Sequence, residues 1–375
     1  MLKLLDIVPY TYLPYFSGGQ KSIAQFLEYL GRDTELTVIS TVTNDPAHIK
    51  TYDLLPILKK SSDRYYDLSL LKKAVSIVQK NKYDAVIWEH PYFYWLARRV
   101  KKRTGTRTII HTHNIEHQRF RSNGCWWWRI LASYEKKFYQ LADIIFFISK
   151  EDREFAINAW KIAPEKCFIV TFGITIKNYP ADKGDCKKTI SAKHGIAIHE
   201  KILLFNGLLD YKPNLDALLF ILNEINPVLL SDRSFRYKII ICGKGLPGHL
   251  NELKQYADKN IIYAGFVDDV EMYFKAADIF LNPVQSGGGI KTKMVEAIAY
   301  GAVVISSETG AAGIERSVCG EKLNIVPDND PIAFADTIIK SSGINSVTPQ
   351  SYYDHYYWGS IVQKAIAAIG GSAGR

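Results

Sequence analysis

The chain has 375 residues, of which 47% are hydrophobic and 23% are charged. This composition excludes a disordered chain, and the length predicts about two domains. A net charge of +9 favours an anionic partner, but no zinc-finger spacing, RNA-binding aromatic motif or basic zipper pattern supports nucleic acid. The sequence lacks a run of about 18 apolar residues, and a proline interrupts the N-terminal apolar region. We therefore expect a cytoplasmic protein without a signal peptide or membrane span.

In the first half, short β-branched runs alternate with amphipathic stretches. The helix predicted at residues 19–31 has Phe26, Leu27 and Leu30 at helical spacing and ends at Gly31. The predicted strands are residues 2–8, 36–40, 84–89, 107–112, 143–149 and 167–172.

The second half repeats this alternation. Its predicted strands are residues 201–207, 237–243, 261–266, 278–283 and 302–306. Continuous apolar strands that alternate with helices are typical of parallel sheets covered on both faces, so we predict an α/β protein of two doubly wound domains. Residues 174–188 are polar and aperiodic. We therefore predict domains at residues 1–180 and 181–345, and a C-terminal helix within residues 346–375 that packs back toward the first domain.

The stretch 287–306, GGGIKTKMVEAIAYGAVVIS, combines bare backbone, two cations and one carboxylate. A glycine loop before a helix from about residue 290 to 300 allows a ligand close to the backbone, and the helix N-terminus attracts phosphate. Lys291 and Lys293 would supply countercharge. Without an anion, cations there are misplaced by roughly 0.3–1 kcal/mol. The alternative is a flexible turn with a solvated basic first turn.

Glu296 is the carboxylate on this otherwise apolar helix. Burying a carboxylate is costly unless it is paired or faces a ligand. We expect it to accept hydrogen bonds from the ribose hydroxyls of a nucleotide. The alternative is a surface position on the helix.

Residues 110–121, IHTHNIEHQRFR, hold three histidines and a glutamate. They lack the spacing of two helical histidines around a glutamate that a zinc site would need, so no metal is predicted. Nor do the five cysteines form a Cys-x-x-Cys pair or a disulfide framework.

Four stretches together resemble the retaining glycosyltransferases of family four: residues 14–19 (PYFSGG), 201–218, 265–283 and 287–306. The resemblance implies a GT-B fold, with two Rossmann-like domains facing across a cleft. It departs from the family in two places. The first glutamate of the family's helix motif falls on Gly288, while the second matches Glu296, and Leu208 stands where many members have an arginine.

The resemblance also implies roles for single residues. His113 would reach the anomeric carbon of the donor, with His111 as second choice, and Glu116 would orient the loop or meet the acceptor. The alternative for His113 is a structural histidine that caps its strand. Donor-binding residues would be Gly18, Gly19, Lys212, Phe266, Val267, Gly288, Gly289, Ile290, Lys291, Lys293 and Glu296.

The sequence therefore predicts a metal-independent glycosyltransferase that moves a sugar from a nucleoside diphosphate to a saccharide or lipid-linked acceptor with retention, in surface polysaccharide or glycoconjugate synthesis. No cofactor is expected beyond the nucleotide sugar as substrate. The alternatives are a nucleotide-sugar epimerase or hydrolase on the same fold, and a non-catalytic nucleotide-sugar-binding subunit.

Residues 126–128 are three consecutive tryptophans among arginines and lysines. Successive helical residues turn by about 100°, so at least one tryptophan should be exposed. Together with the basic run 98–103, this favours peripheral contact with an anionic membrane surface. Packing between domains would explain the tryptophans equally well.

Overall fold

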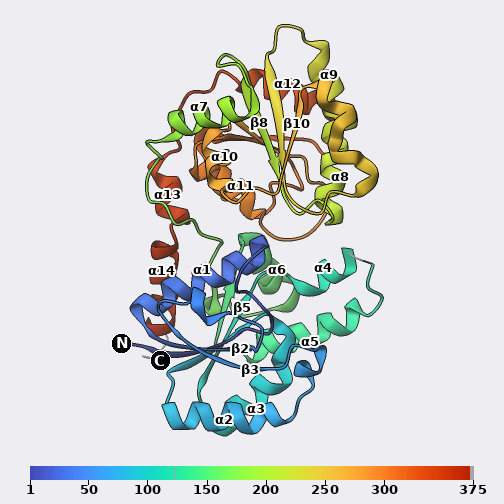
Figure 1. Ribbon diagram of the computed structural model, residues 1–375. Coiled ribbons are helices and arrows are strands. Elements are labelled where there is room, and N and C mark those ends of the chain that lie inside the picture. The colour runs from blue at the N-terminus through green and yellow to red at the C-terminus, as the bar shows by residue number, and fades with distance from the viewer. Residues whose placement is uncertain (123, 372–375) are drawn as a thin grey trace. The chain divides into compact units, whose positions relative to one another are not determined.

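Parallel strands form both sheets of the computed structural model, which describes residues 1–122 and 124–371 (Figure 1). The chain divides into two units. The first is Met1–Gly173 with the C-terminal segment from Tyr356, and the second is Ile174–His355. The division therefore falls before residue 180, and the C-terminal segment itself is shared between the two units.

The first unit contains a sheet in the order β3-β2-β1-β4-β5-β6-β7, with every neighbouring pair parallel. Helices α2, α3 and α5 contribute to a core on one face, and α1 and α14 pack together on the other (Figure 1). The strands are β1 Lys3–Ile7, β2 Glu35–Thr41, β3 Asp53–Leu58, β4 Ala85–Glu89, β5 Arg107–Thr112, β6 Ile144–Phe147 and β7 Cys167–Ile169. The helices are α1 Gly18–Asp33, α2 Ser69–Asn81, α3 Tyr94–Thr104, α4 Glu116–Ser122, α5 Trp128–Leu141, α6 Lys150–Trp160 and α14 Trp358–Gly371.

The second unit contains a sheet in the order β10-β9-β8-β11-β12-β13, also parallel. Helices α8, α9 and α12 share one core with this sheet, and α7, α10 and α11 lie on its other side (Figure 1). The strands are β8 Lys201–Asn206, β9 Tyr237–Cys242, β10 Ile261–Gly265, β11 Ile279–Asn282, β12 Val303–Ser307 and β13 Leu323–Val326. The helices are α7 Lys183–His194, α8 Lys212–Phe220, α9 Asn226–Ser231, α10 Val270–Ala276, α11 Thr292–Ala299, α12 Pro331–Ser341 and α13 Gln350–Tyr356.

Each sheet contains one strand that the sequence analysis did not predict. β3 carries Pro56 and β13 has only four residues, and both lie at a sheet edge. An edge strand tolerates proline and needs little apolar sequence, because one of its sides has no partner strand. The predicted fold class is confirmed, since all the predicted strands form and the two sheets are doubly wound.

Two helix boundaries were predicted wrongly. α1 does not end at Gly31 but continues to Asp33. A Cβ at Gly31 would lie 2.5 Å from the Thr51 carbonyl oxygen, so this glycine permits a close approach and does not terminate the helix. The C-terminal stretch forms two helices and not one. Tyr352 and Tyr353 of α13 donate to α11 carbonyls, while Trp358 of α14 donates to Gln25 of α1.

Candidate functional site

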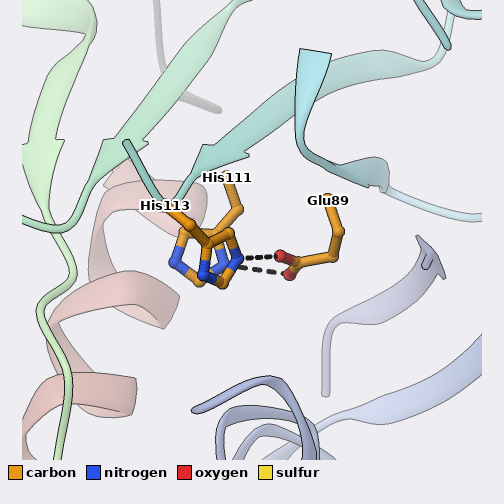
Figure 2. Close-up of side chains that lie close together, drawn as sticks. All are labelled: Glu89, His111 and His113. Atoms are coloured by element: carbon orange, nitrogen blue, oxygen red, sulfur yellow. Dashed lines mark hydrogen bonds and ion pairs between the residues drawn. The ribbon is translucent and has the colours of Figure 1, made fainter. Parts of the chain in front are cut away.

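A buried carboxylate joins the two predicted histidines in the first unit. Glu89 ends β4 and pairs in register with His111 on β5, and His113 follows β5 directly. His111 Nδ1 lies 2.9 Å from Glu89 Oε1, and His113 Nε2 lies 2.6 Å from Oε2 (Figure 2). Adjacent parallel strands end at the same sheet edge, which is why these side chains meet.

The charges in this group follow from its burial. Burial alone would raise the pKa of Glu89, but the two imidazoles offset that effect and hold it well below its usual range. Burial, with His90 nearby, lowers the pKa of His113 to about 4. A neutral His113 therefore donates its Nε2–H to an ionised Glu89, which leaves Nδ1 as an acceptor. Its free lone pair suits it to receive a hydrogen bond from a hydroxyl.

Glu89, His111 and His113 have ligand-type atoms within 4.8 Å of one another, a spacing that also suits a metal ion. The two shortest contacts, at 2.6 and 2.9 Å, are normal hydrogen-bond lengths. Hydrogen bonds from imidazole N–H groups account for how the carboxylate is held.

His90 links this group to Glu116. Its ring stacks on His113 at 4.4 Å between centroids, and its Nδ1 lies 3.3 Å from a Glu116 oxygen. His90 adopts φ 66°, an unfavourable backbone angle for a residue with a side chain. Glu116 is fully buried and accepts from Tyr92 at 2.7 Å and Arg119 at 2.6 Å. Burial would raise its pKa, yet His90 and Arg119 hold it well below the usual range.

The structure thus brings His111, His113 and Glu116 into one buried network, while their roles stay predictions. Sequence reasoning missed Glu89 and His90. The signal was a carboxylate at the end of an apolar strand. This signal could be interpreted only with the knowledge that β4 lies beside β5, and the sequence alone does not give the strand order.

Gly18 and Gly19 form the first turn of α1. Ser17 and Gln20 make a reciprocal capping box that fixes this helix start. Within the described residues, neither glycine amide has a hydrogen-bond acceptor, and a Cβ at Gly19 would meet nothing within 4 Å. The turn therefore presents open backbone donors with the positive end of the helix dipole.

In the second unit, the glycine loop lies between β11 and α11. Gly287 and Gly289 have φ of 87° and 71°, angles that favour glycine. Gly288 is exposed, and Ile290 is buried beneath the loop. The loop therefore offers its backbone at the carboxyl edge of the sheet, where open parallel sheets bind ligands.

Lys293 is held at this edge by neutral oxygens. Its ammonium lies 2.9 Å from the Asn206 carbonyl at the end of β8 and 2.8 Å from Asn214 Oδ1 on α8. Burial, and then the charge of Lys291, lower the pKa of Lys293 to about 7. The sequence analysis did not identify Asn206 and Asn214 as its partners.

Lys291 is held in the same way by the glycine loop. Its ammonium lies 3.1 Å from the Gly287 carbonyl and 3.0 Å from that of Gly289. Burial lowers its pKa to about 8. Among the residues described, no carboxylate forms an ion pair with Lys291 or Lys293. An anion that binds here would raise the pKa of both lysines, so the protein would take up protons as the anion binds.

The remaining predicted donor residues occupy different environments. Glu296 lies one helical turn beyond Lys293 and is half-buried. Phe266 is 64% exposed after β10, with Val267 half-buried beside it. Lys212 is exposed, and its ammonium forms an ion pair with the Asp216 carboxylate at 2.7 Å. This interaction does not direct Lys212 toward Lys291 and Lys293. Each of these assignments stays a prediction.

These features define a class: a two-unit α/β protein with glycine turns that expose backbone groups at strand ends. Residues 16–177 match the model for Glycosyltransferase Family 4, and residues 200–342 match that for Glycosyl transferases group 1. The chain belongs to these glycosyltransferases, as the sequence resemblance predicted.

The chain is also similar to known proteins in sequence and in fold. An uncharacterized 44.6 kDa protein in the cps region of Klebsiella pneumoniae is 25% identical over 303 residues, 77% of this chain and 70% of that protein. A Rickettsia africae glycosyltransferase matches at TM-score 0.74 and 14% identity, covering 100% of this chain and 99% of the other. Anabaena HepE in complex with UDP matches at TM-score 0.70 and 14% identity, covering 99% and 100%. These two structures show that the fold is shared.

His113 should remain neutral across the physiological range. Its buried position lowers its pKa to about 4, whereas an unperturbed histidine titrates near pH 6.5. We expect its ¹⁵N imidazole signals, assigned by comparison with His113→Gln, to keep the Nε2–H tautomer from pH 8 down to pH 5. A blocked histidine peptide in the same buffers is the control. A midpoint near 6.5 for His113 would contradict the network described above.

Proposed function

We propose that this glycosyltransferase uses a nucleoside-diphosphate sugar and transfers the sugar with retention at the anomeric carbon. The observation that carries the proposal is the pair Lys291 and Lys293, whose half-buried ammonium groups donate to neutral oxygens beside a glycine loop and pair with no carboxylate among the described residues. Two cations without a countercharge suit a ligand with two adjacent phosphates.

In the proposed reaction, negative charge would develop on the departing diphosphate, close to these lysines. The bond from the sugar C1 to the diphosphate oxygen breaks, a bond from C1 to the acceptor oxygen forms, and the acceptor's hydroxyl proton passes to the departing diphosphate. Lys291, Lys293 and the loop amides would stabilise the growing negative charge on that leaving group. Because no carboxylate is assigned as a nucleophile, we propose front-face displacement at C1. We also propose that the reaction needs no metal.

Other residues would bind the rest of the donor. Glu296 would accept hydrogen bonds from the ribose hydroxyls, and the backbone at Phe266 and Val267 would flank the base. In the first unit, His113 would act at the reaction centre through its Nδ1 acceptor. The UDP and UDP-glucose complexes of HepE support testing uridine donors first.

For the acceptor we propose a surface polysaccharide or glycolipid precursor. The Klebsiella relative is encoded in a cps region, and a structural neighbour, WaaB, is a lipopolysaccharide outer core galactosyltransferase. WaaB matches at TM-score 0.67 and 15% identity, covering 99% of each chain.

The reaction is tested by measuring release of UDP, GDP and ADP from a panel of sugar donors, with and without saccharide and glycolipid acceptors. We expect one donor class to turn over only with an acceptor, in the presence of EDTA, and the product's anomeric NMR coupling to match that of the donor. Turnover without an acceptor would favour a hydrolase or epimerase. Tight nucleotide binding without any turnover would favour a binding subunit.

The lysine pair should recognise phosphate and not the nucleoside. Replacing Lys291 and Lys293 with Met removes two charge-assisted contacts, so we expect calorimetry to show UDP binding weakened by about tenfold or more, with uridine binding changed little. Lys254→Met, at an exposed lysine paired with Glu252, is the control. Equal losses for UDP and uridine would mean that the lysines only shape the loop.

The α4–α5 turn supports attachment to an anionic membrane at the cytoplasmic face. Trp126 is 83% exposed and Trp127 is 37% exposed, as the sequence predicted for at least one tryptophan. Ile130 is also exposed, while Arg121 and Arg129 lie over the ring of Trp128. Interfacial tryptophans beside cations suit a lipid surface. In the described part of the chain, no helix is long and apolar enough to cross a bilayer.

We expect the protein to co-sediment with vesicles containing anionic lipid at low salt, and to be released as salt screens the attraction. Trp126→Ser with Trp127→Ser should abolish most of this binding. Ile198→Ser with Ile332→Ser, at exposed apolar residues of the second unit, is the matched control. Equal sedimentation of the two variants would assign the tryptophans another role.

A further inference from the structure

A second basic site lies at the opposite edge of the second sheet. A cavity of about 100 Å³ is lined by lysines, serine hydroxyls and an asparagine. Its lining includes Lys201 at the start of β8, Asp278 just before β11, and Lys322 just before β13. These positions are the amino ends of parallel strands. The glycine loop that carries Lys291, by contrast, lies at the carboxyl ends of the strands. A strand of six residues separates the two edges of the sheet by about 20 Å.

The cavity has an excess of positive charge. Its lining contains three lysines, Lys183, Lys201 and Lys322, and a single carboxylate, Asp278. That carboxylate is already engaged. Both of its oxygens contact Lys187, at 2.8 and 2.7 Å, and one also accepts from the Ile202 amide at 2.8 Å.

Among the described residues, no carboxylate forms an ion pair with any of the three lining lysines. Lys183 contacts the Lys275 and Ala277 carbonyls at 2.8 and 2.6 Å, and Lys322, only 3% exposed, contacts the Gly301 carbonyl at 3.0 Å. Lys201 has no side-chain partner among the described residues. Burial lowers the pKa of Lys183 to about 8 and also lowers that of Lys322.

Neutral donors complete the lining. Ser341, Ser346 and Asn345 border the cavity, and no hydrogen bond from their side chains to another described residue competes for them. A small cavity lined by lysines, serines and an asparagine offers several hydrogen-bond donors, which match the several acceptor oxygens of one phosphate group. The volume suits a single phosphate, not a nucleotide.

We propose that this cavity binds a phosphate group, as free orthophosphate or as the terminal phosphate of a sugar phosphate, independently of the donor site. The proposal does not rest on the proposed function, because its residues belong to the amino edge of the sheet alone.

The test uses the full-length protein with the donor loop disabled by Lys291→Met and Lys293→Met, so that phosphate cannot be captured there. We expect orthophosphate to raise the thermal midpoint and to give a calorimetric binding isotherm, while chloride at equal ionic strength does not. Glucose 6-phosphate in the same assay distinguishes the two sources, since tighter binding of the ester indicates a sugar phosphate and tighter binding of orthophosphate indicates the free ion.

Two variants locate the binding. Lys201→Met should weaken phosphate binding about tenfold, and this half-buried lysine can be replaced without removing a contact to the fold. Lys183→Met should weaken it further. Lys188→Met, on the same helix as Lys183 but exposed and paired with Asp185, should bind as the parent does. Binding unchanged in Lys201→Met and Lys183→Met, or equal responses to phosphate and chloride, would overturn the proposal.

Discussion

Parallel strand pairing is the constraint on which both candidate sites depend. When every strand of a sheet runs in one direction, the chain segments that follow the strands gather at one edge and those that precede them gather at the other. Glu89 meets His111 and His113 because β4 and β5 are parallel neighbours. Lys293 meets Asn206 because α11 follows β11, and β11 lies beside β8.

Burial then gives these side chains their chemical character. Glu89 stays ionised because two imidazoles surround it, while Asp6, on the neighbouring strand β1, has no hydrogen-bond partner for either oxygen among the described residues. Burial, reinforced by the charge of Glu89, raises the pKa of Asp6 well above its usual range. The pKa values of two buried carboxyl groups on adjacent strands are therefore shifted in opposite directions, which favours negative charge on the one that orients the histidines.

What the sequence could predict depended on how local the signal was. The glycine loop, Lys291 and Lys293 are close together in the sequence, so a phosphate site could be predicted there without knowledge of the fold. The partnership of Glu89 with His113 was not, because it requires the order of strands in the sheet. Strands β3 and β13 were missed because edge strands need only weak patterning. The end of α1 was predicted wrongly because a glycine that permits close contact with Thr51 cannot be distinguished, in the sequence alone, from a glycine that ends a helix.

The two basic edges of the second sheet differ in how helix dipoles act on them. Lys183 lies at the carbonyl end of α10, where the dipole favours a cation. Lys291 and Lys293 lie at the amino end of α11, where the dipole opposes them. Lys291 and Lys293 are therefore the less stable arrangement without a ligand, and an anion bound there would offset the dipole, the cost of burying their charges and their mutual repulsion together. At the opposite edge no such opposing dipole acts on Lys183, and the excess positive charge of Lys183, Lys201 and Lys322 alone would attract an anion, so a single phosphate is sufficient there.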